Sequence, residues 1–367
     1  MNTPHDDIIK NFRNYIFRHP IAEETFADLI TSLQTASTPR VIIFTGPTGV
    51  GKSTLTAAAC NRILKYYESQ MRAELNFVPL VTISAVPPNS SGFSWKDFYI
   101  RLLTGQHEPL VDRKLLLPRQ PELFPDQALV GRSLERCVSD TLRRSVEEYF
   151  RHRRTKFLVV DEAHHMLLVN GRQRLECQFE SLKSLTIQTG VTILLVGTYR
   201  LLDILEQSGQ LTRRSHVVNF RRYDIRDPND RKGFRMVLAY LEQRMSEIVP
   251  TSLSESIKDV EYFYCKCAGC VGILKNWLSH CLEQALEEKA SLIDVSYADR
   301  FALKNRGVIT IAEEALHGEA KLADVSDARL LDLLNNGVLL GDGESHKTLV
   351  KRRIGQRKPK RDPVGTK

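Results

Sequence analysis

The sequence predicts an α/β fold, in which a five-stranded parallel sheet flanked by helices is followed by a small helical domain. Five short apolar runs alternate with helical patterns between residues 41 and 220, a glycine-rich turn follows the first run, and helical periodicity alone continues to about residue 289. Strands that alternate with helices form parallel sheets, and such sheets bind ligands at the carboxyl ends of their strands.

The predicted strands are the apolar runs themselves, which span 41–45, 77–86, 157–161, 191–196 and 217–220. Two amphipathic helical patterns precede the first strand, one with apolar residues from Ile8 to Phe17 and one from about Ala22 to Leu33. The stretch from Pro87 to Leu134 is rich in Pro, Ser and Gly, which indicates a long loop or insertion with one short helix over 95–103. Three helical segments follow the last strand, at 232–245, 252–267 and 272–289.

Composition is typical of a folded globular protein, with 42% apolar and 26% charged residues. No apolar run approaches the ~20 residues of a membrane-spanning helix, and the amino terminus lacks the apolar centre of a signal peptide. The seven cysteines are odd in number and scattered, as expected for reduced thiols in the cytoplasm. The spacing of Cys265, Cys267 and Cys270 matches no standard zinc finger, and we interpret them as part of a buried helix.

The net charge of +8 arises in the carboxyl-terminal tail. From Lys347 onward there are nine Lys or Arg residues and one acidic residue, whereas the first 346 residues hold 43 of each sign. A basic run with Pro, Gly and few apolar residues is predicted to be disordered. It is either a solubilising tail or an arm that binds DNA or RNA through counterion release.

The glycine-rich turn after the first strand reads GPTGVGKS and has the pattern of a phosphate-binding loop, or P-loop. Its glycines let successive backbone N–H groups point at phosphate oxygens at the start of the next helix, Lys52 is expected to reach the β- and γ-phosphates, and the Ser53 hydroxyl is expected to bind Mg²⁺. The candidate ATP-binding residues of this loop are Gly46, Pro47, Thr48, Gly49, Val50, Gly51, Lys52, Ser53 and Thr54.

A second motif ends the third strand with two acidic residues, Asp161 and Glu162. Acidic residues at the end of a buried strand are costly unless they have a function. Asp161 is expected to hold Mg²⁺ and so to belong to the ATP site, and Glu162 to orient and polarise the attacking water. His164 and His165 follow, and without a third ligand in the sequence we interpret them as polar loop residues rather than a metal pair.

Two further candidates come later in the chain. Thr198 follows the fourth strand, where its hydroxyl would sense the γ-phosphate, although Gly-Thr after a strand is also ordinary turn chemistry. Arg213 and Arg214 stand just before the fifth strand, where either would act on the γ-phosphate of a neighbouring subunit as an arginine finger. An arginine pair without such context is usually a solvated surface.

The order of these motifs resembles the AAA+ regulators of DNA transposition of the TniB/TnsC family. The resemblance covers about residues 15 to 290, and its most specific part runs from DEAHH to SGQLTRRSHVVNFRRYD. It implies an AAA+ P-loop NTPase that uses ATP and Mg²⁺, a finger at Arg213 or Arg214, and Thr198 at the sensor-1 position, where Asn is common. Lys275 occupies the sensor-2 position of the lid, where Arg is more usual. A lysine ammonium carries one charge but lacks the forked pair of donors of a guanidinium, so it couples more weakly to phosphate.

With this resemblance the chain divides into five expected parts: an N-terminal helical segment at 1–36, the nucleotide-binding domain at 37–223, a helical lid at 224–290, a C-terminal extension at 291–346 and the basic tail at 347–367. Among several basic candidates for DNA contact, family architecture favours Lys96 and Arg101, after the second strand. The implied activity is ATP hydrolysis that controls assembly.

The implied partners are double-stranded DNA, further copies of the chain in a ring or helical filament, a transposase, and a TniQ-like target-selection protein, with a CRISPR-associated system as one form. No membrane is implied. Two alternatives share the same ATPase core. One is a replication initiator or helicase loader, which usually appends a winged-helix domain, and the other is a signalling or defence switch that acts without DNA.

Overall fold

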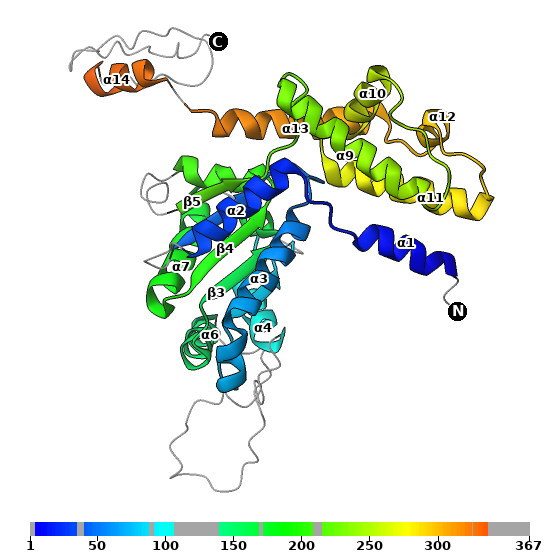
Figure 1. Ribbon diagram of the computed structural model, residues 1–367. Helices are drawn as coiled ribbons and strands as arrows, with labels where there is room; N and C mark the ends of the chain where they lie inside the picture. The colour runs from blue at the N-terminus through cyan, green and yellow to red at the C-terminus, as the bar shows by residue number, and fades with distance from the viewer. Residues whose placement is uncertain are drawn as a thin grey trace, which may run out of the picture. The chain divides into compact units, whose positions relative to one another are not determined.

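The computed structural model describes residues 4–34, 40–87, 92–105, 139–168, 172–207, 215–324 and 326–336. The chain forms two compact units, Met1–Leu322 and Ala323–Lys367, and the first of them holds the sheet and most helices (Figure 1). Three regions named above lie wholly or mostly outside the described residues, namely the loop or insertion at 87–134, the arginine pair at 213–214 and the basic tail at 347–367.

The centre of the first unit is a five-stranded sheet in the order β2-β3-β4-β1-β5, in which every pair is parallel. The strands are β1 (Val41–Thr45), β2 (Leu80–Ser84), β3 (Phe157–Asp161), β4 (Thr192–Gly197) and β5 (Ser215–Asn219). The five-stranded parallel sheet predicted from the sequence is therefore confirmed. Thr45 pairs with Gly197 and with Asn219, so these three strands end at one edge of the sheet.

Helices cover both faces of this sheet because its strands are apolar on both sides. Residues Ile42 and Phe44 of β1 belong to the core under α2 (Pro20–Gln34) and α3 (Lys52–Ala73). The alternate residues Val41 and Ile43 belong to the core on the other face. That face is covered by α4 (Trp95–Gly105), α6 (Ser139–Arg153) and α7 (Arg172–Thr189). Two short 3₁₀ helices, η2 (Ala163–Leu167) and η3 (Tyr199–Gln207), follow β3 and β4.

The part of the chain expected to be the lid, 224–290, holds three helices in the structure, α9 (Pro228–Ser246), α10 (Ile257–Cys267) and α11 (Val271–Glu288), and α12 (Val295–Asp299) follows them. Local signals fix where two of them start. Asp227 caps α9 by accepting a hydrogen bond from the Asn229 N–H, and Ser256 and Asp259 form a reciprocal capping box at α10. The lid residues Phe234 and Leu274 share one apolar core with the sheet, so the lid packs directly on the α/β domain.

The N-terminal helix α1 (Pro4–Asn14) lies against α11 of the lid (Figure 1). Arg13 pairs with Glu283 at 2.6 Å. Ring stacking holds the segment between α1 and α2. The ring centroids of Tyr15 and Phe17 lie 5.9 and 4.3 Å from the ring centroid of Tyr240. The first helix is therefore tied to the lid, whereas α2 packs on the sheet.

Helix α13 (Asn305–Leu322) runs back to the α/β domain and packs on η3. The contact is close, because a Cβ added at Gly318 would lie 2.1 Å from the Tyr199 ring, and Lys321 forms an ion pair with Asp203. In the second unit, α14 (Asp327–Asn336) is the described element. No helix in the described part of the chain combines the length and the apolar character of a membrane span.

Candidate nucleotide-binding site

The P-loop joins β1 to α3, and its backbone follows the conformation that its glycines allow. Gly49 and Gly51 have φ values of 76° and 114°, in the left-handed region that favours glycine. A Cβ at Gly46 would lie 2.3 Å from the carbonyl oxygen of Phe220, so only glycine fits beside the residue that follows β5. The loop ends where α3 starts at Lys52, so the positive end of that helix faces the loop.

Lys52 is held by its own loop. Its Nζ donates to the carbonyl oxygens of Gly46 and Pro47 at 2.9 and 2.8 Å. Burial lowers the pKa of Lys52 to about 8, although the carboxylates of Glu162 and Asp161 favour its charged form. A half-buried ammonium that forms no ion pair within the described residues fits an anionic ligand, and phosphate oxygens would supply the missing charge.

The acidic pair lies at the same edge of the sheet. Asp161 ends β3 opposite Ser84 of β2, and its carboxylate accepts a hydrogen bond of 2.8 Å from the Glu162 N–H. Glu162 has φ 51° and ψ 33°, a left-handed conformation that costs a non-glycine residue of the order of 1 kcal/mol. This turn lets the Glu162 side chain leave the strand exposed, while the next residue, Ala163, is buried.

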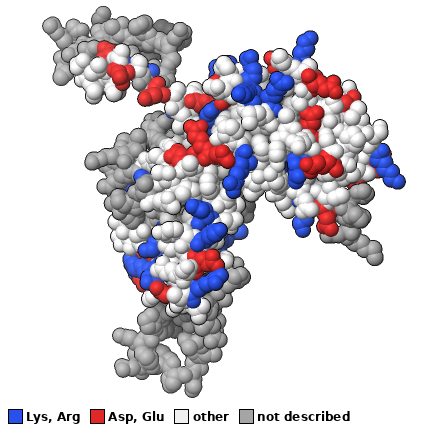
Figure 2. All heavy atoms as spheres, in the orientation of Figure 1, with Lys and Arg blue, Asp and Glu red and all other residues white. Residues whose placement is uncertain are grey.

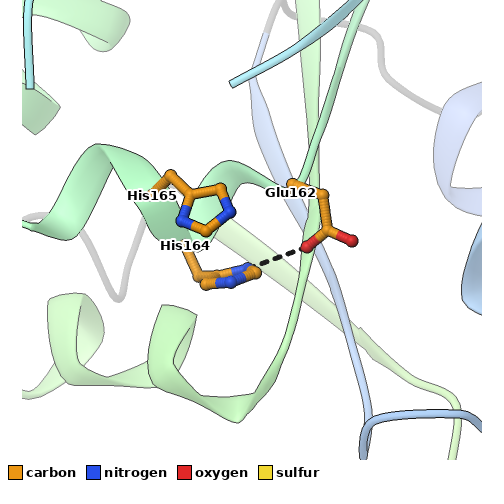
Figure 3. A group of neighbouring side chains, drawn as sticks. All are labelled: Glu162, His164 and His165. Atoms are coloured by element: carbon orange, nitrogen blue, oxygen red, sulfur yellow. Dashed lines mark ion pairs between the residues drawn. The ribbon is translucent and has the colours of Figure 1, made fainter. Parts of the chain in front are cut away.

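Two histidines of η2 lie beside this glutamate (Figure 3). Nδ1 of His164 is 3.2 Å from Glu162 Oε2, within ion-pair distance but without the alignment of a hydrogen bond. Nδ1 of His165 is also buried without a hydrogen-bond partner in the described chain. Burial lowers the pKa of His164 to about 4, and neighbouring cations lower it further, so this imidazole is neutral near pH 7.

Thr198 follows β4 at the same edge. Its hydroxyl oxygen is buried, and so is that of Thr45 at the end of β1, and neither has a hydrogen-bond partner among the residues described. Buried hydroxyls usually find partners, because leaving one unpaired costs about 1–3 kcal/mol. Two unpaired hydroxyls next to a P-loop and an acidic pair fit a polar ligand such as a nucleotide with Mg²⁺.

The structure thus brings the P-loop, Asp161, Glu162 and Thr198 to one edge, with Ser53 exposed in the first turn of α3. The roles assigned to them remain predictions. In that arrangement the P-loop and Lys52 would hold the phosphates of ATP, and Ser53 and Asp161 would hold Mg²⁺. The ion would supply charge neutralisation on the phosphate oxygens.

The lid also reaches the P-loop, at the start of α11. The Ile273 N–H donates to the Gly49 carbonyl oxygen at 3.1 Å, and a Cβ at Gly272 would lie 2.4 Å from that oxygen. The first turn of α11 has no side-chain cap from Cys270. Two helix amino ends, those of α3 and α11, therefore meet at the same loop, which increases the positive potential there.

Lys275, the expected sensor-2 residue, makes its described contacts elsewhere. Its Nζ donates to the carbonyl oxygens of Arg13 and Tyr15 at 2.7 and 2.6 Å. It therefore caps the last carbonyls of α1 and joins that helix to α11. Burial lowers the pKa of Lys275. In this arrangement its ammonium binds the carboxyl end of α1 and makes no described contact with the P-loop.

Sequence reasoning missed the acidic side chains of α13, which act on basic residues of the α/β domain. The guanidinium of Arg222, in the segment after β5, is held by the Glu319 carboxylate. A second acid of this helix, Glu314, is close enough to raise the pKa of Lys52 slightly. Arg222 lies in the quoted FRRYD stretch, but its partner is 97 residues away, so no local pattern could have found it.

The two candidate DNA contacts both lie on α4. Arg101 is exposed and pairs with Asp97 at 2.6 Å, one turn away, and Lys96 is half-buried and has an interaction partner. On the face shown in Figure 2, basic and acidic side chains are interspersed over the lid and the α/β domain. A DNA contact at Lys96 and Arg101 therefore remains a prediction.

The cysteine group sits at the turn between α10 and α11. Cys265 is exposed, whereas Cys267 and Cys270 are buried. Burial raises the pKa of Cys270 to about 12 and raises that of Cys267 as well, so both are protonated thiols at neutral pH. The Cys267 thiol donates to the Tyr264 carbonyl oxygen and the Cys270 thiol to the Ala268 carbonyl oxygen, within the same turn.

Comparisons with known proteins agree with this fold. Residues 34–205 match the family model of an AAA domain. The ORC2 protein of Aeropyrum pernix in its ADP form aligns with a TM-score of 0.50 at 13% identity, over 80% of this chain and 71% of that one. Two further structures align with lower scores. The ORC1 protein of the same organism in complex with DNA has a TM-score of 0.48 at 13% identity, over 83% of this chain and 69% of that one. A Walker-type ATPase of Pyrococcus abyssi has a TM-score of 0.45 at 16% identity, over 87% and 79%.

No curated protein matches the sequence. The family match, the sheet order and the P-loop together define the class: the chain has the AAA+ P-loop ATPase fold, with a helical region after the sheet domain.

Proposed function

We propose that this chain is an ATP-dependent regulator of DNA transposition that oligomerises on double-stranded DNA and links target selection to a transposase. The observation that carries the proposal is the ordered motif set: a P-loop after β1, the DEAHH motif at the end of β3, Thr198 after β4, and an arginine pair directly before β5. This order, with the stretch from DEAHH to FRRYD, is the one that resembles the TniB/TnsC family.

Hydrolysis of ATP would use the edge of the sheet described above. Lys52 binds the phosphates, and Glu162 orients a water molecule for attack on the γ-phosphorus. Phosphoryl transfer depends mainly on positioning and charge neutralisation, which a fixed ammonium and a carboxylate beyond the strand end supply. Thr198 would contact the γ-phosphate through its unpaired hydroxyl. Product release would then weaken the assembly.

The arginine finger is proposed to act in trans. Ser215, the first residue of β5, pairs with Val41 at the amino end of β1, whereas the P-loop starts at the carboxyl end of β1. These two edges are separated by the length of a five-residue strand, roughly 16 Å at about 3.3 Å per residue. The arginine pair itself lies outside the described residues, and its action in trans is proposed from the family resemblance.

The decisive experiment is electron microscopy of the chain with double-stranded DNA and a non-hydrolysable ATP analogue. Rings or filaments are expected for wild type and for Glu162→Gln, and none for Lys52→Ala. Particles that stay single under all conditions would overturn the proposal.

The finger is tested with Arg213→Ala and Arg214→Ala. The variant that removes the finger should bind ATP and hydrolyse none. Mixed with Lys52→Ala, which retains both arginines, it should recover part of its hydrolysis, because its own P-loop is intact. Equal hydrolysis by both single variants and wild type would exclude a finger at this pair.

The alternative is a replication initiator or helicase loader, which the same ATPase core would serve. Capture of a replicative helicase in place of a transposase and a TniQ-like protein would favour it. A chain that assembles without DNA, and whose activity does not depend on salt, would instead favour the DNA-independent switch.

A further inference from the structure

Glu162, His164 and His165 are residue types that bind metal ions, and their side chains lie close together. One possible ligand atom from each residue can be chosen so that all three lie within 4.8 Å of one another. In Figure 3 the three side chains extend to the same side of the turn that joins β3 to η2. We propose that these three residues bind a divalent transition-metal ion of the zinc class.

The backbone explains why adjacent residues can converge. The left-handed turn at Glu162 redirects the chain into η2, so the glutamate side chain returns toward the two residues that follow Ala163. The two imidazole rings then lie 4.2 Å apart with 42° between their planes. In an extended strand, neighbouring side chains would point to opposite faces instead.

One nitrogen of each imidazole forms no hydrogen bond within the described chain. Nδ1 of His164 and Nδ1 of His165 are both buried without a hydrogen bond. A histidine kept for packing usually bonds through at least one buried nitrogen, since an unpaired polar atom costs about 1–3 kcal/mol. Two nitrogens without hydrogen bonds, one of them 3.2 Å from a carboxylate oxygen, indicate a ligand that accepts electron pairs, which a metal ion does.

The donor set selects the metal. Two imidazoles and one carboxylate suit Zn²⁺, Co²⁺ or Ni²⁺, whereas Mg²⁺ prefers oxygen ligands alone. Ligand atoms around zinc lie roughly 3.4 Å apart, as follows from bonds of about 2.0–2.1 Å in a tetrahedral site. Glu162 Oε2 already lies 3.2 Å from Nδ1 of His164, close to that spacing, and a fourth position would stay open to water.

Metal binding at this site would regulate ATP hydrolysis, an inference that rests on the proposed function. Glu162 is the residue proposed to orient the attacking water, so an ion that takes its carboxylate should stop hydrolysis. The P-loop residues are not ligands in this site, so ATP binding should continue. Zinc would therefore hold the protein in its ATP-bound, assembled state.

The site is tested by titrating the full chain with Co²⁺, without nucleotide and without Mg²⁺. A visible absorption band of low-symmetry Co²⁺ should saturate at one equivalent, and Zn²⁺ should remove it. His164→Ala and His165→Ala should each weaken binding at least tenfold, and Glu162→Gln should weaken it too. The matched control is His152→Ala, an exposed histidine of α6, which should bind as wild type does.

Three outcomes would overturn the site: no band, a band with thiolate character that identifies cysteine ligands, or equal affinity in the histidine variants. His164→Asn and His165→Asn retain polarity, and their melting curves separate loss of ligand from loss of fold. Zn²⁺ inhibition of hydrolysis is then compared between wild type and His165→Asn. If wild type hydrolyses no ATP, the proposed function fails while the Co²⁺ titration still decides the metal site.

Discussion

The guanidinium of Arg222 donates two hydrogen bonds to the carboxylate of Glu319, from Nε to Oε1 at 2.8 Å and from Nη2 to Oε2 at 3.1 Å. Arg222 also donates to the Tyr264 hydroxyl at 2.9 Å and is 9% exposed. One buried arginine therefore connects three parts of the first unit: the segment after β5, the lid helix α10 and the distant helix α13.

Glu319→Gln should loosen α13, because it leaves the Arg222 charge buried with weaker partners. We expect a loss of about 2–3 kcal/mol in the free energy of unfolding, below the about 3–5 kcal/mol of fully buried pairs because Glu319 is partly exposed. Urea unfolding measures it, and hydrogen exchange of α13 amides shows where the loss occurs. Glu313→Gln, an exposed neighbour, should change stability by less than about 0.5 kcal/mol. Equal effects of the two variants would contradict this account of the pair.

ATP affinity should fall at high pH because of Lys52. Burial sets the pKa of this group to about 8 in the free protein, and bound phosphates should raise it. Below pH 8 the ammonium is charged in both states, so affinity is at its maximum. Above pH 8 binding must take up a proton, and the Kd should rise up to tenfold per pH unit. Fluorescent nucleotide titrations from pH 7 to 9.5 measure this, and Lys52→Arg should show no such slope because arginine stays charged.

Gly272→Ala should weaken nucleotide binding. The added Cβ would lie 2.4 Å from the Gly49 carbonyl oxygen, so either the P-loop or the start of α11 must move. A tenfold or larger rise in the Kd for ATP is expected in equilibrium binding. The control is Gly307→Ala, a helical glycine with open space around it, which should leave the Kd unchanged and stabilise α13 slightly. A Gly272→Ala protein with normal affinity would show that the lid contact does not shape the P-loop.

Lys275→Met distinguishes two roles for one residue. If Lys275 mainly caps α1, the variant should expose α1 to proteolysis and hydrogen exchange while ATP hydrolysis stays within twofold of wild type. If instead hydrolysis falls while α1 stays protected, the sensor-2 role holds. Lys258→Met, on the exposed side of α10, serves as the control for charge loss on the lid.

Stability should fall in mild acid because of His19. This residue is 4% exposed, and its Nδ1 lies 3.1 Å from the Tyr223 hydroxyl. Burial lowers the pKa of His19 from 6.5 to about 4, so the folded state resists protonation that the unfolded chain accepts. The stabilisation is complete above pH 6.5 and is lost as pH falls toward 4, by up to about 1.4 kcal/mol per pH unit.

Urea unfolding at pH 7, 6 and 5 measures that loss. His19→Asn keeps a hydrogen-bond acceptor near the Ala22 N–H and removes the titration, so its stability should depend less on pH. An identical pH dependence in wild type and His19→Asn would assign the effect to other groups, of which His164 is the first to test.

The sequence by itself determined the strands of the sheet interior, because buried parallel strands are continuous apolar runs. The runs at 41–45 and 157–161 match β1 and β3 at both ends. The edge strand β5 begins two residues earlier than its apolar run, at Ser215, because an edge strand tolerates polar residues that pattern reading leaves out. The residues of the P-loop and of the acidic pair could also be identified from the sequence, since each motif is contiguous and its chemistry requires that spacing.

Only the tertiary structure decided which distant groups meet. Lys275 caps α1 across 260 residues, and Glu319 reaches Arg222 across 97, and neither contact leaves a periodic or local trace in the sequence. Glu162 is close to His164 and His165 in the sequence, yet the three side chains come together only because the backbone at Glu162 is left-handed. Local propensity selects strands and turns residue by residue, whereas these contacts arise from packing of whole helices and from a backbone conformation that L-residues rarely adopt.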